Sequence, residues 1–131
     1  MAVGNPYDKY KTTQIQTATP GQLILMLYQG AIKFCKISKI SIEDKDFIKA
    51  NKYLIKVQDI ITELTISLDM KSGSEIAKNL SSLYEYMNRK LLEANIKKDI
   101  EIISEVQSLL EELESAWQEA VKKTGGVRPR R

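Results

Sequence analysis

The residues that could carry covalent chemistry are few in this sequence. It contains no histidine and a single cysteine, Cys35. Without histidine, the chain lacks both the commonest general base and the commonest metal ligand. A lone cysteine without such a base has nothing to generate its thiolate, and the apolar neighbours of Cys35 predict a thiol inside the core.

The acidic residues and the glycines give no catalytic pattern either. Glu111, Glu112 and Glu114 stand close together, but no Glu-x-x-His motif accompanies them, which favours a solvated helix face. The glycine-containing stretches "SGSE" and "TGGV" lack the spacing and the strand context of phosphate-binding loops. We therefore predict no catalytic residues, no metal site and no cofactor, and we expect a protein that is not an enzyme.

Composition predicts one globular domain with a nearly neutral body. The chain has 131 residues, of which 43% are hydrophobic and 28% charged. The net charge is +3, and three of the last four residues are Arg128, Arg130 and Arg131; without them 17 basic residues (20 − 3) balance 17 acidic ones. This balance predicts no nucleic-acid interface. The arginines themselves suit either a solubilising tail or contact with phosphate or an acidic surface.

The distribution of apolar residues predicts a cytoplasmic protein. No basic segment followed by an apolar run stands at the N-terminus, so we expect no secretory signal. No apolar run reaches the roughly 18 residues of a transmembrane helix, and a single cysteine suits a reducing compartment.

Hydrophobic residues recur at the helical period and predict four helices. The first begins at Thr19, with proline at the first helical position and a capping box to Gln22, and runs to about residue 41. The second follows Asp44 or Asp46 and runs to about residue 69. The third follows "MKSGSE", where Ser72 has capping-box spacing to a glutamate, and the fourth begins at residue 99.

Connections this short require neighbouring helices to be antiparallel. The predicted fold class is all-α, an antiparallel up-down-up-down four-helix bundle over residues 19–123. We expect residues 1–18 to form an N-terminal arm that caps a partner-binding groove, and residues 124–131 to form a flexible basic tail.

Residues spaced alternately by three and four predict the core stripes of the later helices. For the second helix the stripe is Phe47, Ala50, Leu54, Val57, Ile61, Leu64 and Leu68. The third and fourth helices carry Ala77, Leu80, Tyr84, Met87, Leu91 and Ala94, and Ile103, Val106, Leu110, Leu113, Trp117 and Ala120.

The first helix has more apolar surface than one bundle face requires. We expect its core side to hold Ile24, Leu27, Ala31, Phe34 and Cys35, with Leu25 and Ile32 on one flank and Met26 and Ile37 on the other. Two compatible interpretations remain: this helix is the most buried one, with the arm packed over it, or its flanks form grooves for helices of a partner. Further apolar residues lie off the predicted stripes: Ile48, Tyr53, Ile55, Ile60, Ile66, Leu83, Tyr86, Leu92, Ile102 and Leu109.

Several stretches resemble the FliS family of flagellin-specific export chaperones. They are "TATPGQLILMLYQGAI" with the preceding Tyr10, "ANKYLIKVQDIITELTISLD", "GSEIAKNLSSLYEYMNRKLLEAN" and "ELESAW", which together span nearly the whole chain. The resemblance implies a cytoplasmic helical bundle that binds the C-terminal region of flagellin. It also implies that the bundle prevents premature polymerisation of flagellin, and that it assists delivery to the flagellar type III export machinery.

The resemblance also implies where the partner binds. The partner-binding positions that the resemblance implies most directly are Tyr10, Ile15, Leu23 and Tyr28, and it implies Tyr7 and Tyr86 more weakly. We add Leu25 and Met26 because they flank the core side of the first helix. The alternative function is a self-associating helical adaptor module, and a weak homodimer is compatible with either function.

Overall fold

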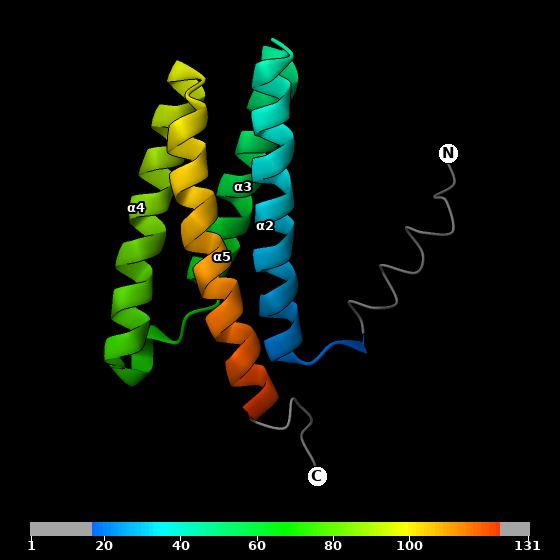
Figure 1. Ribbon diagram of the computed structural model, residues 1–131. Coiled ribbons are helices and arrows are strands. Elements are labelled where there is room, and N and C mark those ends of the chain that lie inside the picture. The colour runs from blue at the N-terminus through cyan, green and yellow to red at the C-terminus, as the bar shows by residue number, and fades with distance from the viewer. Residues whose placement is uncertain (1–16, 124–131) are drawn as a thin grey trace, which may run out of the picture.

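The computed structural model describes residues 17–123, and these residues form an antiparallel bundle of four α-helices. The helices are α2 (Pro20–Glu43), α3 (Phe47–Ile66), α4 (Glu75–Lys97) and α5 (Ile100–Lys123), with a short 3-10 helix, η1 (Met70–Ser72), before α4. They run alternately up and down (Figure 1), so the predicted fold class is confirmed. The predicted basic tail lies outside the described residues, as does the predicted arm apart from residues 17 and 18.

The first two helices begin at the residues that capping chemistry predicts. The Thr19 hydroxyl accepts from the backbone N–H of Gln22 at 3.2 Å, and the Gln22 side chain accepts from the Thr19 N–H at 2.9 Å. Asp46 caps α3 through the Lys49 N–H at 3.1 Å. These side chains occupy N–H groups that have no partner within the helix.

The N-cap of α4 differs from the prediction. It is Ser74, which accepts from the Ala77 N–H at 3.3 Å, and not Ser72, because the chain first makes the short helix η1 and turns at Gly73 with φ 72°. Between α4 and α5 the chain turns at Lys98, which has a left-handed backbone conformation. The Asp99 carboxylate then accepts from two N–H groups of the first turn of α5.

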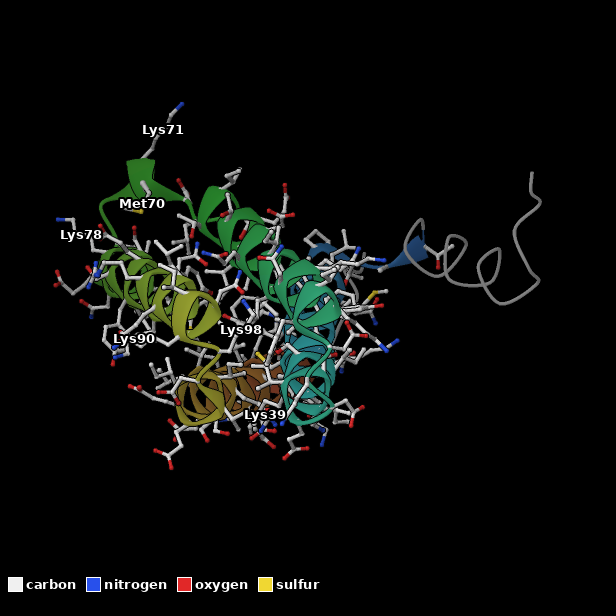
Figure 2. All side chains as sticks on the ribbon, turned by 90° about the horizontal axis from the view of Figure 1, so that it is seen from above. Lys39, Met70, Lys71, Lys78, Lys90 and Lys98 are labelled. Atoms are coloured by element: carbon white, nitrogen blue, oxygen red, sulfur yellow. The ribbon has the colours of Figure 1, made fainter. Side chains whose placement is uncertain are left out.

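Viewed along its axis, the bundle places the helices around one core in the order α2, α3, α4 and α5 (Figure 2). The stripe predicted for α3 supplies much of that core, since Ala50, Leu54, Val57, Ile61 and Leu64 are all buried. The predicted core stripes are wrong at the start of α3 and near the end of α5. Phe47 is exposed at the start of α3, and Ala120 is exposed near the end of α5.

The core face of α2 is rotated from the predicted one. Its buried apolar residues are Tyr28, Ala31, Ile32 and Cys35, whereas the predicted core residues Ile24, Leu27 and Phe34 are only partly buried. Ile32, expected on a flank, is therefore a core residue. Towards the C-terminal end of α2, two buried serines, Ser38 and Ser41, continue this face, and the apolar pattern could not reveal them. Their hydroxyls donate to backbone carbonyl oxygens one turn earlier, at 2.8 Å each.

A core substitution at the middle of α3 tests this packing. Ile61 is fully buried, so Ile61→Ala should lower the free energy of unfolding by about 2–5 kcal/mol, through lost burial and the cavity that remains. Chemical denaturation measures the change. Ile48 is 86% exposed on the same helix, and the matched variant Ile48→Ala should stay within about 0.5 kcal/mol of the parent. Equal losses in both variants would contradict the observed register of α3.

Candidate functional site

The candidate sites on the described residues are apolar hollows at the bundle surface. Within residues 17–123 no group of three or more His, Cys, Asp or Glu side chains is arranged to hold a metal ion. Cys35 is buried, and desolvation raises the pKa of its thiol to about 12, so the reactive thiolate is disfavoured. None of the described helices combines the length and apolarity needed to cross a bilayer.

One hollow is a groove between α3 and α4. It has a volume of about 530 Å³ and is lined by residues of these two helices alone: Gln58, Thr62, Thr65, Ile66, Ser81, Glu85, Asn88, Arg89 and Leu92. Large apolar side chains continue its line along both helices. Ile48, Ile55 and Ile66 on α3 and Leu92 and Ile96 on α4 are between 44% and 86% exposed. We call this surface the α3–α4 groove.

The groove stays open because polar and small side chains line the outer seam between α3 and α4. Asn95 donates to Asn51 at 2.7 Å near one end of the groove. Near its middle, Gln58 donates to the backbone carbonyl of Asn88 at 3.4 Å, and the Asn88 side chain donates to Thr62 at 3.5 Å. These contacts connect the helices without filling the space above them with apolar side chains. Unpartnered aliphatic residues consequently remain at the surface.

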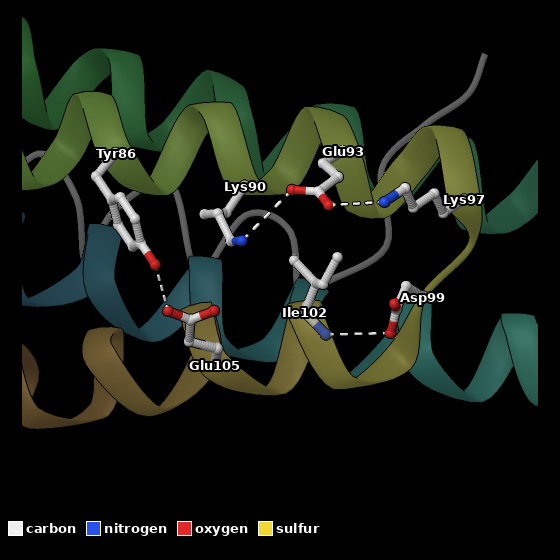
Figure 3. A network of polar contacts seen from close by, with 7 residues as sticks. All are labelled: Tyr86, Lys90, Glu93, Lys97, Asp99, Ile102 and Glu105. Atoms are coloured by element: carbon white, nitrogen blue, oxygen red, sulfur yellow. Dashed lines mark hydrogen bonds and ion pairs between the residues drawn. The ribbon is translucent and has the colours of Figure 1, made fainter.

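The seam between α4 and α5 is also bridged by a polar pair (Figure 3). Tyr86 on α4 donates to the Glu105 carboxylate on α5 at 2.5 Å, and this bond raises the pKa of the Tyr86 phenol. On α4 itself, Glu93 accepts from Lys97 at 2.9 Å and from Lys90 at 3.4 Å, and these bonds lower the pKa of its carboxyl group. Tyr86 thus has a partner within the bundle.

A second hollow, of about 310 Å³, lies where α2 and α4 begin and α5 ends. Tyr28 and Tyr84 meet there across the bundle with their hydroxyl oxygens 2.5 Å apart, and burial raises the pKa of both phenols. Trp117, which also lines this hollow, donates to the Gly21 carbonyl at 2.9 Å. Aromatic hydroxyl and indole groups therefore tie three helices together at this end. We call this hollow the end pocket.

The structure does not bring the predicted site residues together in one groove. Leu23, Leu25 and Met26 on α2 are partly buried, and Tyr28 lies in the core. Tyr7, Tyr10 and Ile15 lie outside the described residues. Tyr86 is on α4, at the seam with α5.

The α2 residues also point in different directions. Gln29 contacts Glu114 of α5, and Gly30 lies next to Ile60 of α3. At about 100° per residue, these contacts place Leu25 on the α5 side of α2 and Met26 on its outward side.

Sequence reasoning missed the α3–α4 groove as a site, although a signal was present. Ile48, Ile55, Ile66 and Leu92 are all apolar residues that lie off the predicted stripes. Each is a single apolar residue on an otherwise polar face, which is ordinary for a helix surface. Only the pairing of α3 with α4 gathers them into one surface.

Comparison with known proteins identifies a family and a fold. A family model described as "Flagellar protein FliS" matches residues 3–124. The flagellar secretion chaperone FliS of Bacillus subtilis is 39% identical over 93% of this chain and 90% of its own length. The Salmonella typhimurium protein of the same name is 40% identical over 80% and 78%. A solved structure described as a flagellar chaperone from bacteria has the same fold, with a TM-score of 0.75 at 16% identity, covering 89% of this chain and 95% of that one.

The buried titratable groups predict a loss of stability in alkali. Burial raises the pKa of Cys35 from 9.0 to about 12, and it raises those of Tyr28 and Tyr84 above 10.0. A raised folded-state pKa contributes stability in full below the unfolded value, and that contribution is lost as pH rises towards the folded value. Denaturation midpoints should therefore fall from about pH 9 upward, and more steeply above pH 10. Cys35→Ala should delay the onset of the fall to about pH 10, and Tyr84→Phe should make it shallower above pH 10; unchanged profiles in both variants would contradict the linkage.

Proposed function

The chain belongs to the FliS family of flagellar secretion chaperones, and from this membership we propose that it binds the C-terminal segment of flagellin in the cytoplasm. We further propose that binding prevents premature polymerisation and that the complex is delivered to the flagellar type III export machinery. The observation that carries the proposal is the α3–α4 groove, which is long, apolar at its rims and built on two rigid helices.

The groove suits a helix as its occupant. An amphipathic helix can place one apolar face into a groove between two helices and leave its polar face in water. From Ile48 to Ile66, α3 rises by about 27 Å at 1.5 Å per residue, so the groove offers length for about five helical turns. Burial of the exposed isoleucine and leucine side chains would supply the driving force, at about 25 cal/mol for each Å² of apolar surface.

In the proposed mechanism, the chaperone and a second flagellin subunit compete for the same apolar faces of the flagellin segment. A flagellin segment that is disordered alone folds on the chaperone, and its ordering costs free energy that an extended apolar contact must offset. While those faces are covered, they are unavailable to a second flagellin subunit. The handover needs no nucleotide hydrolysis in this mechanism, because displacement along the export path suffices.

We propose a second contact on the N-terminal half of α2, where Leu23, Leu25 and Met26 are partly exposed. A client long enough to leave the α3–α4 groove could continue around the bundle to these residues. The arm residues Tyr7, Tyr10 and Ile15 are proposed to cover this part of α2 and to be displaced. Tyr86 is proposed only as a peripheral contact because its hydroxyl already binds Glu105.

The exposed groove also supports the alternative of self-association. Its apolar rim could pair with the same rim of a second copy and give a weak homodimer. Light scattering with and without the flagellin segment separates the two functions. A chaperone gives a complex with the client, whereas a self-associating adaptor gives a dimer that the segment leaves intact.

Charge substitutions at the groove should separate binding from stability. Ile55→Glu and Leu92→Glu should each weaken binding of the flagellin C-terminal segment at least tenfold, because an unpaired carboxylate would be desolvated in an apolar contact. Each should change the free energy of unfolding by no more than about 0.5 kcal/mol, since both side chains are exposed. Calorimetric binding and thermal unfolding measure the two effects.

A matched control distinguishes the groove from other surfaces. Ile40 on α2 is 57% exposed and lies outside the groove, so Ile40→Glu should bind as the parent does. If Met26→Glu abolishes binding while Ile55→Glu and Leu92→Glu do not, the client uses α2 and the α3–α4 groove is not its site.

A further inference from the structure

The middle of the α3–α4 groove is polar, in contrast to its rims. Gln58, Thr62 and Asn88 meet there, and the donor and the acceptor of each hydrogen bond between them can be assigned. Thr62 donates its hydroxyl hydrogen to the Gln58 backbone carbonyl at 3.0 Å, which leaves the hydroxyl oxygen to accept from the Asn88 amide nitrogen at 3.5 Å. The Gln58 amide nitrogen donates to the Asn88 backbone carbonyl at 3.4 Å.

This network leaves one acceptor without a donor. Because the Asn88 amide nitrogen points to Thr62, the side-chain oxygen of Asn88 points elsewhere, and it is buried with no hydrogen-bond partner among the described residues. A buried acceptor without a partner costs free energy, and native structures contain few of them. The two bonds that orient Gln58 and Asn88 are longer than the usual 2.7–3.2 Å. Rotation of the Gln58 or Asn88 side chain would therefore cost little hydrogen-bond energy, and it would let a new donor reach the Asn88 oxygen.

Apolar and charged residues around this point restrict what can supply the donor. Ile55 and Leu92 lie about one helical turn from it on one side, and Ile66 lies further along on the other. Arg89 and Glu85 line the same groove and form an exposed ion pair at 3.7 Å. Because Arg89 and Glu85 already pair with each other, a charged side chain would have to compete for one of them, and an anionic side chain would also offer no hydrogen. A neutral donor that can also accept a bond fits best.

We propose that the α3–α4 groove selects helices that present a carboxamide, from asparagine or glutamine, at the centre of an otherwise apolar stripe. Once the Asn88 side chain rotates towards the groove, the carboxamide nitrogen donates to its unpaired oxygen, and the carboxamide oxygen accepts from the Gln58 side chain. Asn88 is then the specificity-determining residue, because only a helix that carries a donor gains this bond. The inference rests on the proposed function for the identity of the natural client, but it can be tested without that client.

The test uses two synthetic helical peptides of about 18 residues, matched to the length of the groove. Both carry leucines at i, i+3, i+4 and i+7 spacing, and they differ only at the central stripe position, which is glutamine in one and leucine in the other. The protein should bind the glutamine peptide about tenfold more tightly, because the leucine peptide leaves the Asn88 oxygen unpaired. Asn88→Leu should remove or reverse this preference. Asn79→Leu makes the same change on an exposed part of α4 away from the groove and should retain it.

Stability provides a second readout. Since Asn88→Leu removes a buried unpaired acceptor, its thermal midpoint should be no lower than that of the parent. If this variant does not fold, Asn88→Ala serves in its place, and it should likewise lose the preference for glutamine.

The possible results distinguish a failure of this inference from a failure of the proposed function. Equal binding of both peptides, a preference that persists in Asn88→Leu, or no binding of either peptide would each overturn the inference. Binding of the flagellin C-terminal segment is measured in parallel with the parent protein. If that segment binds while the peptides show no preference, the carboxamide rule fails and the proposed function stands. If the segment does not bind but the peptide preference appears and is lost in Asn88→Leu, the proposed function fails and the groove's selectivity stands.

Discussion

The narrowness of the buried stripe on α3 is the constraint on which the rest of the structure depends. Ala50, Leu54, Val57, Ile61 and Leu64 follow a spacing of four and three, so they cover a single face of the helix. That face is used entirely by the core. Every other apolar residue of α3 must therefore lie on a flank or in solvent. Ile60 packs beside α2, which leaves Ile48, Ile55 and Ile66 uncovered.

The two long seams of α4 show how polar side chains decide which surfaces remain available. On the α5 side, Tyr86 and Glu105 bridge the helices. On the α3 side, amides and hydroxyls connect the helices at the level of Gln58 and Asn88, and the aliphatic side chains stand apart on the rims. These amides keep the space between the two helices open at some expense of burial.

Most of the fold could be predicted from the sequence, because bundle topology follows from local information. Capping residues, the helical period and short connections determined the number, order and direction of the helices, and the core residues of α3 and α4 followed from spacing. The errors have local causes. Ser72 has the capping-box spacing but is followed by Ser74, a better-placed cap, and the core face of α2 continues through Ser38 and Ser41, whose hydroxyls are satisfied by the helix itself.

The candidate site was harder to predict because it depends on which flanks become neighbours. The surplus of apolar residues in α2 indicated a partner surface on that helix, yet part of this surplus serves the bundle. Tyr28 is buried against Tyr84 of the diagonally opposite helix, a pairing that no spacing along one helix can indicate. The surface with the most exposed aliphatic residues comes instead from isolated residues on two other helices. A continuous apolar run is a sign of burial, and burial within the chain competes with burial against a partner. Residues that lie off the core stripe and converge only after folding, such as Ile55 and Leu92, are free of that competition and are better candidates for a surface that a partner covers.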